Sequence, residues 1–292
     1  MVSFLFAPAV LFGQTSVSPA FEVASLKEAL PLSIEHIQGG QFHVGVSING
    51  ARADYGYMSL ADLIPYAYRV ERYQVSGPGW MNEKRWDILA TFPADQTADR
   101  APEMMQNLLA ERFKLAIHRD SREQSVYELV VGKGALKIKE GPAEEEVAGG
   151  NSGMGNVRIN NDGGRATISG GPTGIVHTTG GPSGLQLHMA KITMAALAGM
   201  LTQFMDRPVI NATDLKGNYQ VTLDLPSDLM NGMPAAQKLT AILGLGSYGM
   251  VPDTSGAAIF QAVKGLGLEL KSRKDFVETI IVDHMEKTPT AN

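Results

Sequence analysis

Apolar and polar residues alternate along several short stretches of the chain. The clearest examples are "RWDILATF" from Arg85 and "NYQVTLDL" from Asn218, in which every second residue is apolar. Shorter stretches with the same period are "FEVASLK", "HVGVSI", "YQVSG", "RPVI" and "LQLHMAKI". A period of two places alternate side chains on opposite faces of a strand, so the pattern predicts half-buried strands.

A different period marks two helices. In the first, helical spacing relates the apolar residues Met104, Met105, Leu108, Leu109 and Phe113, and Pro102 suits the first turn. In the second, the same spacing relates Ile259, Phe260, Val263 and Leu266. After each helix, two apolar runs predict a hairpin: "KLAIHRD" with "SVYELVV", and "LELKSRK" with "FVETIIVDH".

Two further helices are predicted from their N-caps. Ser59 and Thr193 can each accept a hydrogen bond from a backbone amide of the first turn, and Asp62 after Ser59 matches a capping box. Pro65 lies within the first of these helices, where it removes a backbone hydrogen bond. We therefore expect a kink or an early end at Pro65.

The two halves of the chain show a weak self-similarity. Ser59 aligns with Thr193, Trp80 with Leu215 and Trp86 with Tyr219, at nearly the same offset of about 134 positions. Later segments align at a larger offset because the second copy has an insertion between Pro226 and Gly256. The sequence thus predicts an α+β fold of two related modules, each with a small, mainly antiparallel sheet and two helices.

A glycine-rich segment separates the two predicted modules. Residues 141–184 hold thirteen glycines and few large apolar side chains, which favours flexibility because little surface can be buried there. Within it, "RATIS" and "GIVHT" could still pair with the edge of a sheet. The predicted boundaries are a signal peptide at 1–20, a first module at 21–140, a linker at 141–184 and a second module at 185–292.

Composition limits the classes of partner. The 292 residues carry 44% apolar and 19% charged residues, which is typical of a globular chain, and the net charge is -5. Because nucleic-acid-binding proteins usually present a basic face, we expect no nucleic-acid partner. The absence of cysteine excludes disulfides, thiolate nucleophiles and cysteine-ligated metals.

The first residues resemble an export signal. The chain is apolar from Val2 to Phe12, which is the length of a signal-peptide core and too short to span a bilayer. Lys27 is the first positive charge, whereas a signal peptide normally begins with one. A start codon assigned too far downstream would explain this difference, and a buried N-terminal strand or helix is the alternative. No later apolar run is long enough for a transmembrane helix.

No motif of catalysis or metal binding occurs in the sequence. "GLGSYG" at 244–249 fits the pattern G-x-G-x-x-G, but "MVPDTSG" follows it where a dinucleotide site needs a helix. The six histidines have no spacing typical of metal ligands, except loosely His36 and His43, and a spacing of seven on an extended, glycine-containing stretch does not place both rings at one metal. The carboxylate pairs lie in predicted turns or on exposed faces, so we assign no catalytic residue, cofactor or metal from the sequence.

Aromatic residues provide the remaining binding candidates. Both tryptophans lie in "GPGWMNEKRWDILATF", where Trp86 alternates with Ile88 toward one face and is expected in the core. Trp80 follows Gly-Pro-Gly in a turn, where it could either fill the core or bind a partner. Because Tyr, Trp and Arg are frequent at interfaces, the candidate binding residues are Trp80, Arg85 and Tyr73.

The ordered series "FEVASLK", "MSLADLIPYAY", "YQVSGPGWMNEKRWDILA", "LLAERFKLAIHRDSREQSVYELVV", "ITMAALAGMLTQFMDRPVINATDLKGNYQVTLDL" and "IIVDHMEKTP" resembles a soil-associated family of unknown function that is expanded in Acidobacteria. The resemblance extends from Phe21 to Pro289 and implies an exported protein, without assigning catalytic residues. A fainter similarity links "AAIFQAVKGLGLEL" to the short N-terminal domains of secretins and TonB-dependent receptors, which are periplasmic interaction modules.

Two functional hypotheses follow from the sequence. The first is an exported, non-enzymatic module of the cell envelope, periplasmic or extracellular, that binds a protein, a peptide or a small ligand. The second is an extracytoplasmic hydrolase or transferase whose site lies between the modules. A concave site that groups His118, His188 or His284 with an acid would favour the second hypothesis.

Overall fold

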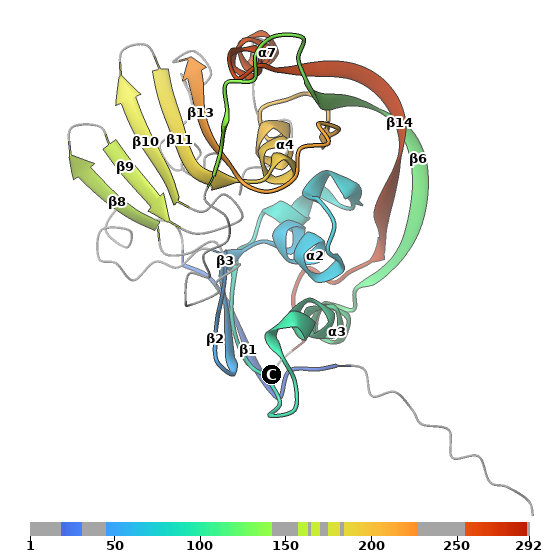
Figure 1. The fold of residues 1–292 in the computed structure, drawn as a ribbon. Coiled ribbons are helices and arrows are strands. Elements are labelled where there is room, and N and C mark those ends of the chain that lie inside the picture. The colour runs from blue at the N-terminus through green and yellow to red at the C-terminus, as the bar shows by residue number, and fades with distance from the viewer. Residues whose placement is uncertain are drawn as a thin grey trace, which may run out of the picture.

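The computed structural model describes residues 19–30, 45–141, 157–162, 165–169, 175–181, 184–226 and 255–290. Strands and helices in this part of the chain form three sheets flanked by helices, which confirms the α+β class (Figure 1). The predicted signal peptide, the predicted insertion between Pro226 and Gly256 and "GLGSYG" lie wholly or largely outside the described residues. No helix of the described residues is both long and apolar enough to cross a membrane.

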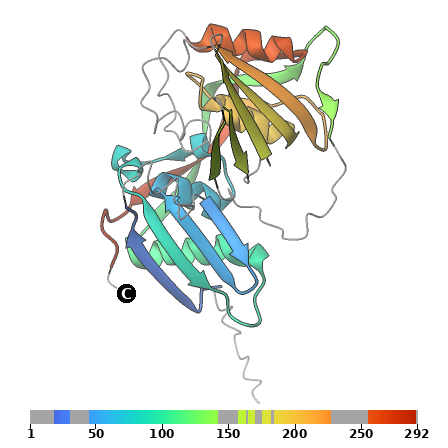
Figure 2. The same ribbon diagram turned by 90° about the vertical axis from the view of Figure 1, so that its left-hand side faces the viewer.

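The first sheet belongs to the N-terminal half and is antiparallel throughout. Its strands lie in the order β1 (Val23–Glu28), β5 (Trp86–Thr91), β3 (Arg52–Met58) and β2 (Gly45–Asn49). Helices α2 (Leu60–Tyr68) and α3 (Ala101–Phe113) lie against one face, as Figure 2 shows. The predicted alternation along β5 is confirmed, because Trp86, Ile88 and Ala90 are buried toward these helices.

The second sheet is larger and also antiparallel. Its strands lie in the order β7 (Lys139–Glu140), β13 (Tyr219–Pro226), β11 (Gly184–Ile192), β10 (Ile175–Gly181), β9 (Arg165–Ser169) and β8 (Val157–Asp162). Helices α4 (Met194–Thr202) and α7 (Ser255–Gly265) contribute to the same core. "RATIS" lies in β9 and the described part of "GIVHT", from Ile175, lies in β10, so the glycine-rich segment adds β8, β9 and β10 to this sheet.

Two long strands join the halves. Strand β6 (Ala116–Val131) and strand β14 (Leu268–His284) pair antiparallel from one end to the other and form the arc in Figure 1. The two predicted hairpins are therefore wrong: each pair of runs is one continuous strand. No glycine or proline interrupts 119–126 or 271–279, so the two strongest turn-forming residues are absent from the middle of both strands.

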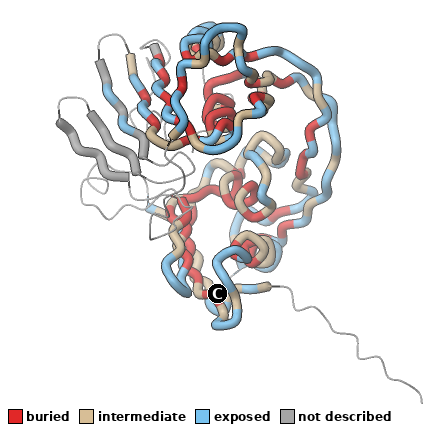
Figure 3. The backbone as a smooth tube through the Cα atoms, viewed as in Figure 1, coloured by how far each residue is buried: buried red, intermediate tan, exposed pale blue. Residues whose placement is uncertain are grey.

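Short strands attach each half to the long strand of the other half. Strand β4 (Val75–Ser76) pairs in parallel with β14, and β12 (Val209–Asn211) pairs in parallel with β6. Each long strand also contributes to the core of the other half. Leu129 of β6 is buried in the second core, and Met285, just beyond β14, is buried in the first core. The middle of the arc is mostly exposed, whereas helices α2 and α4 are mostly buried (Figure 3).

The predicted helix starts are confirmed. The hydroxyl of Thr193 accepts a hydrogen bond from the amide of Ala196 at 3.1 Å, and Asp62 accepts one from the amide of Ser59 at 2.9 Å. The early end at Pro65 is wrong, because α2 continues to Tyr68. Pro65 is buried in the first core, and the packing of α2 around it offsets the missing backbone hydrogen bond.

Candidate functional site

The two tryptophans have separate surroundings. Trp86 is 3% exposed and packs edge-to-face on Phe113, with ring centroids 5.4 Å apart, so the prediction that it belongs to the core is confirmed. Trp80 lies in the short helix η2 (Gly79–Asn82) and is half-buried against the same core. The ammonium of Lys287, near the C-terminus, lies 6.0 Å from the centroid of its ring. Part of the Trp80 ring thus remains accessible.

Arg85 belongs to an ionic cluster at the start of α2. Its guanidinium donates to Asp62 at 2.7 Å and lies 5.6 Å from the centroid of the Tyr57 ring. Arg72 also donates to Asp62, and its second terminal nitrogen donates to Asn82. We call Ser59, Asp62, Arg72, Asn82 and Arg85 the Asp62 cluster.

The Asp62 cluster is mostly enclosed. The side chain of Asp62 is 8% exposed, and those of Arg72 and Arg85 are 15% and 17% exposed. A carboxylate at the N-terminal turn of a helix is also favoured by the helix dipole. The cluster joins α2 to the segment between α2 and β5, and a ligand of Arg85 would have to compete with Asp62.

Tyr73 lies in the short helix η1 (Arg72–Gln74) and is half-buried. Burial, followed by the neighbouring charge of Glu71, raises the pKa of the Tyr73 hydroxyl to about 12. Glu71 lies against α4 of the second half, since a Cβ built on Gly199 would lie 3.2 Å from its Oε2. The three candidate binding residues thus have different surroundings. Trp80 lies near Lys287, Arg85 is paired with the enclosed carboxylate of Asp62, and Tyr73 lies near the contact between the halves.

The histidines that the enzyme hypothesis invoked lie on exposed strands. Nδ1 of His118 lies 2.7 Å from Oδ1 of Asp283, across the paired strands β6 and β14. About half of each side chain is exposed, so water surrounds the pair. His36 and His43 lie outside the described residues. Within the described ranges, no group of three or more His, Cys, Asp or Glu residues is placed to hold a metal ion.

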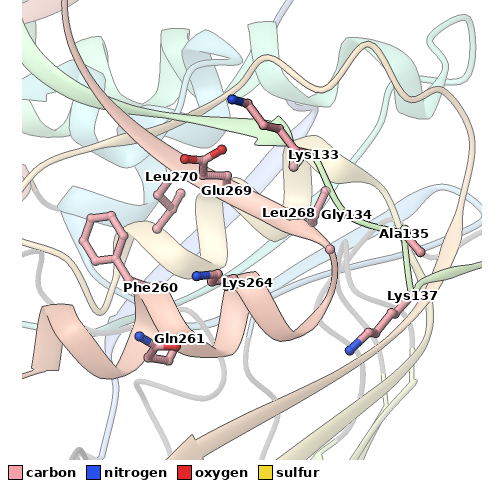
Figure 4. A pocket seen from close by; sticks show the side chains of 12 residues that line it. Lys133, Gly134, Ala135, Lys137, Phe260, Gln261, Lys264, Leu268, Glu269 and Leu270 are labelled. Atoms are coloured by element: carbon pink, nitrogen blue, oxygen red, sulfur yellow. The ribbon is translucent and has the colours of Figure 1, made fainter.

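A groove of about 660 Å³ lies at the end of β6, beside α7 and the start of β14 (Figure 4). Its walls come from the connection after β6, from one side of α7 and from the first residues of β14. The lining residues are Gly132, Lys133, Gly134, Ala135, Lys137, Phe260, Gln261, Lys264, Gly267, Leu268, Glu269 and Leu270.

Close backbone contacts fix the shape of the groove. The amide of Gly132 donates to the carbonyl of Gly267 at 2.9 Å, and the amide of Lys137 donates to that of Leu266 at 2.9 Å. Gly267 has φ +81, and a Cβ there would lie 2.4 Å from the carbonyl oxygen of Ala135. Only glycine fits both this conformation and this contact, so Gly267 holds the connection after β6 against the turn into β14.

The groove is positively charged and has one apolar wall. Lys133, Lys137 and Lys264 are exposed, and Glu269 is the one acidic residue among the lining residues. In the part of the chain that the structure describes, none of the three lysines forms an ion pair. Phe260 and Leu270 supply the apolar wall, and Phe260 packs edge-to-face on Tyr127 at 5.2 Å.

Sequence reasoning missed this groove. Lys264 is more than a hundred positions from Lys133 and Lys137, so no local pattern links them. The signals that were available are the two glycine-containing stretches "GKGALK" and "KGLGLE", which flank the end of β6 and the start of β14. Only the pairing of the two strands reveals that these stretches meet.

Comparison with known proteins assigns the chain to a family whose function is unknown. A family model described as a protein of unknown function, DUF3738, matches residues 61–285. Since the match spans most of the chain, including both long strands and the second core, the protein belongs to the DUF3738 family. Searches of curated proteins and of solved structures find no match.

Proposed function

We propose that this protein is an exported, non-enzymatic binding protein of the cell envelope that holds a small anionic ligand in the groove beside α7. The observation that carries the proposal is the combination of volume and charge. A volume of about 660 Å³ lies within the range of small-molecule sites. Three lysines without an ion-pair partner among the described residues would attract a carboxylate, phosphate or sulfonate, and Phe260 and Leu270 would contact an apolar part of the same molecule.

Export rests on the apolar segment from Val2 to Phe12 and on the resemblance to the exported acidobacterial family and, more faintly, to periplasmic interaction domains. The experiment is mass spectrometry of the protein from fractionated cells. We expect it in the periplasmic or extracellular fraction, starting at or before Phe21, because Phe21 packs on Tyr55 and Phe92 in the first core. A full-length chain found in the cytoplasm would contradict export.

We also propose that the halves are related modules, with boundaries at 21–140 and 185–292. The support is the order of elements among the described residues, because a strand, a helix, two strands, a helix and a long strand occur in the same order in each half. In both halves the strand before the first helix pairs with the strand before the second helix. An experimental structure in which the halves do not superpose would contradict this proposal.

Ligand binding in the groove can be tested with a probe of the proposed chemistry. Anilinonaphthalene sulfonate carries an anionic group and an apolar ring system, and its fluorescence rises in an apolar site. We compare the wild type with a groove variant in which Lys133, Lys137 and Lys264 are each replaced by Gln. The control carries the same replacement at the exposed lysines Lys27, Lys114 and Lys216, which lie outside the groove, so both variants change the net charge by the same amount.

We expect saturable binding to the wild type and to the control, and at least a tenfold weaker affinity in the groove variant. Binding to the wild type should also weaken as salt screens the lysines. Equal loss in both variants would show that the probe responds to net charge alone and would refute the groove as the site. Unchanged binding in both variants would place the probe elsewhere.

A further inference from the structure

Two histidines face each other on the outer surface of the second sheet. His177 of β10 is directly opposite His188 of β11 in the antiparallel register, and both side chains are exposed. Their rings are stacked, with centroids 6.4 Å apart and planes inclined by 25°. The alternation of β11 explains the direction of His188, because its neighbours Leu187 and Met189 are buried on the inner face.

A third strand orients one of the two rings. Nδ1 of His188 lies 2.9 Å from the hydroxyl oxygen of Thr222 on β13, which is its direct partner in the register. In the tautomer that carries its proton on Nδ1, His188 donates to the Thr222 hydroxyl, and Nε2 keeps its lone pair. A hydrogen bond at one ring nitrogen that directs the other nitrogen toward a ligand is the usual support of a metal-binding histidine.

The spacing of the rings suits a shared ion. A coordinating nitrogen lies about 2.0–2.1 Å from zinc, so two rings on one ion have centroids about 5 to 6 Å apart. The centroids of His177 and His188 need to approach by about an ångström to reach that distance, which small changes in the side-chain torsion angles can supply. Neutral imidazole is a preferred ligand of Zn²⁺, Cu²⁺ and Ni²⁺, whereas Mg²⁺ and Ca²⁺ prefer oxygen.

We propose that His177 and His188 form a surface site for a divalent transition-metal ion, with Thr222 as a positioning residue. Two imidazoles supply two ligands, and water completes the coordination, which keeps the ion exchangeable. The site is separate from the groove, since neither histidine is among the groove residues. It therefore stands or falls independently of the proposed function.

The test is isothermal titration calorimetry, in which Zn²⁺ is added to the untagged full chain. A second titration with Mg²⁺ is the comparison. We expect Zn²⁺ to bind with one ion per chain and Mg²⁺ to give no signal. His177→Ala and His188→Ala should each weaken Zn²⁺ binding by at least about tenfold, and Thr222→Val by about tenfold through loss of the supporting hydrogen bond.

The matched control is His118→Ala, which removes an equally exposed histidine that is paired with Asp283 on another sheet. It should leave Zn²⁺ binding unchanged. Because His177 and His188 are exposed, their variants should unfold at the wild-type temperature, and circular dichroism checks this. Zn²⁺ binding that survives both substitutions, or is lost in the His118→Ala control, would overturn the proposal, as would the absence of any Zn²⁺ binding to the wild type.

Discussion

Charged side chains gather at the Asp62 cluster and at the groove, and the two places differ in how the charges are balanced. In the Asp62 cluster, two guanidinium groups share one enclosed carboxylate, and the hydroxyl of Ser59 and the amide of Asn82 complete the hydrogen bonds. In the groove, three exposed lysines line a concave surface together with one glutamate.

The difference separates a structural role from a binding role. Removing one partner from an enclosed, satisfied cluster leaves a charge that water reaches poorly, so breaking such a cluster destabilises the fold. Exposed lysines contribute little to stability, and their positive charge can attract an anionic ligand. Arg85 is a binding candidate from its sequence neighbours, and since its guanidinium is paired with Asp62 we propose a structural role for it.

The largest expected effect concerns the core beside the Asp62 cluster. Trp86→Ala should lower the free energy of unfolding by about 3–5 kcal/mol, because it removes a large ring that is 3% exposed and packed on Phe113. Urea denaturation measures the change. Trp80→Ala is the control and should cost clearly less, since Trp80 is only half-buried. Equal losses would contradict the distinction between the two tryptophans.

The next effect tests the cluster itself. Asp62→Ala should cost about 2–3 kcal/mol, somewhat less than a fully buried pair, because both arginines keep some contact with water. The control is Glu28→Ala, which breaks the exposed pair with Lys84 and should cost less than about 1 kcal/mol. If Asp62→Ala were as mild as its control, the cluster would not be a structural element.

A smaller effect is expected at alkaline pH. The pKa of Tyr73 is raised from an ordinary value of 10.0 to about 12 in the folded protein, chiefly by burial. This contribution to stability is fully present below about pH 10 and is lost as pH rises toward 12, because the unfolded chain ionises first. Tyr73→Phe should therefore reduce the fall in unfolding free energy between pH 10 and 12, as measured by urea denaturation at fixed pH. An unchanged slope would contradict the burial of this hydroxyl.

The smallest effect on stability should come from the groove. Replacing Lys133, Lys137 and Lys264 by Gln should change the free energy of unfolding by no more than about 0.5 kcal/mol, because exposed charges without ion-pair partners support little structure. Denaturation of the same variant that loses the anionic probe provides the measurement. A loss as large as that of Asp62→Ala would remove the contrast between the two places.

Trp80 and Tyr73 remain candidates for binding a protein or peptide. If a partner contacts Trp80, Trp80→Ala should weaken that interaction while the protein stays folded. Co-purification from envelope extracts, with Trp80→Phe as a variant that keeps an aromatic ring, would test this. Retention of every partner by Trp80→Ala would exclude it as a contact residue.

The sequence alone determined the local elements of this fold. Residues that interact within a helix or alternate along a strand are near in sequence, so the N-caps Ser59 and Thr193, helix α3 and strand β5 could all be predicted. The same applies to the placement of Trp86 in the core, because alternation with Ile88 already indicates a buried face.

Tertiary structure decided what the long strands pair with. The apolar runs in β6 and β14 were correctly located. Each long strand pairs with the other, about 150 positions away, and the two runs within a strand do not form a hairpin. The groove and the facing pair of His177 and His188 depend on such pairings, which bring together residues that no local pattern relates. Local periodicity reports which face of an element is buried, whereas strand pairing decides which side chains meet, and the candidate sites of this protein arise from those meetings.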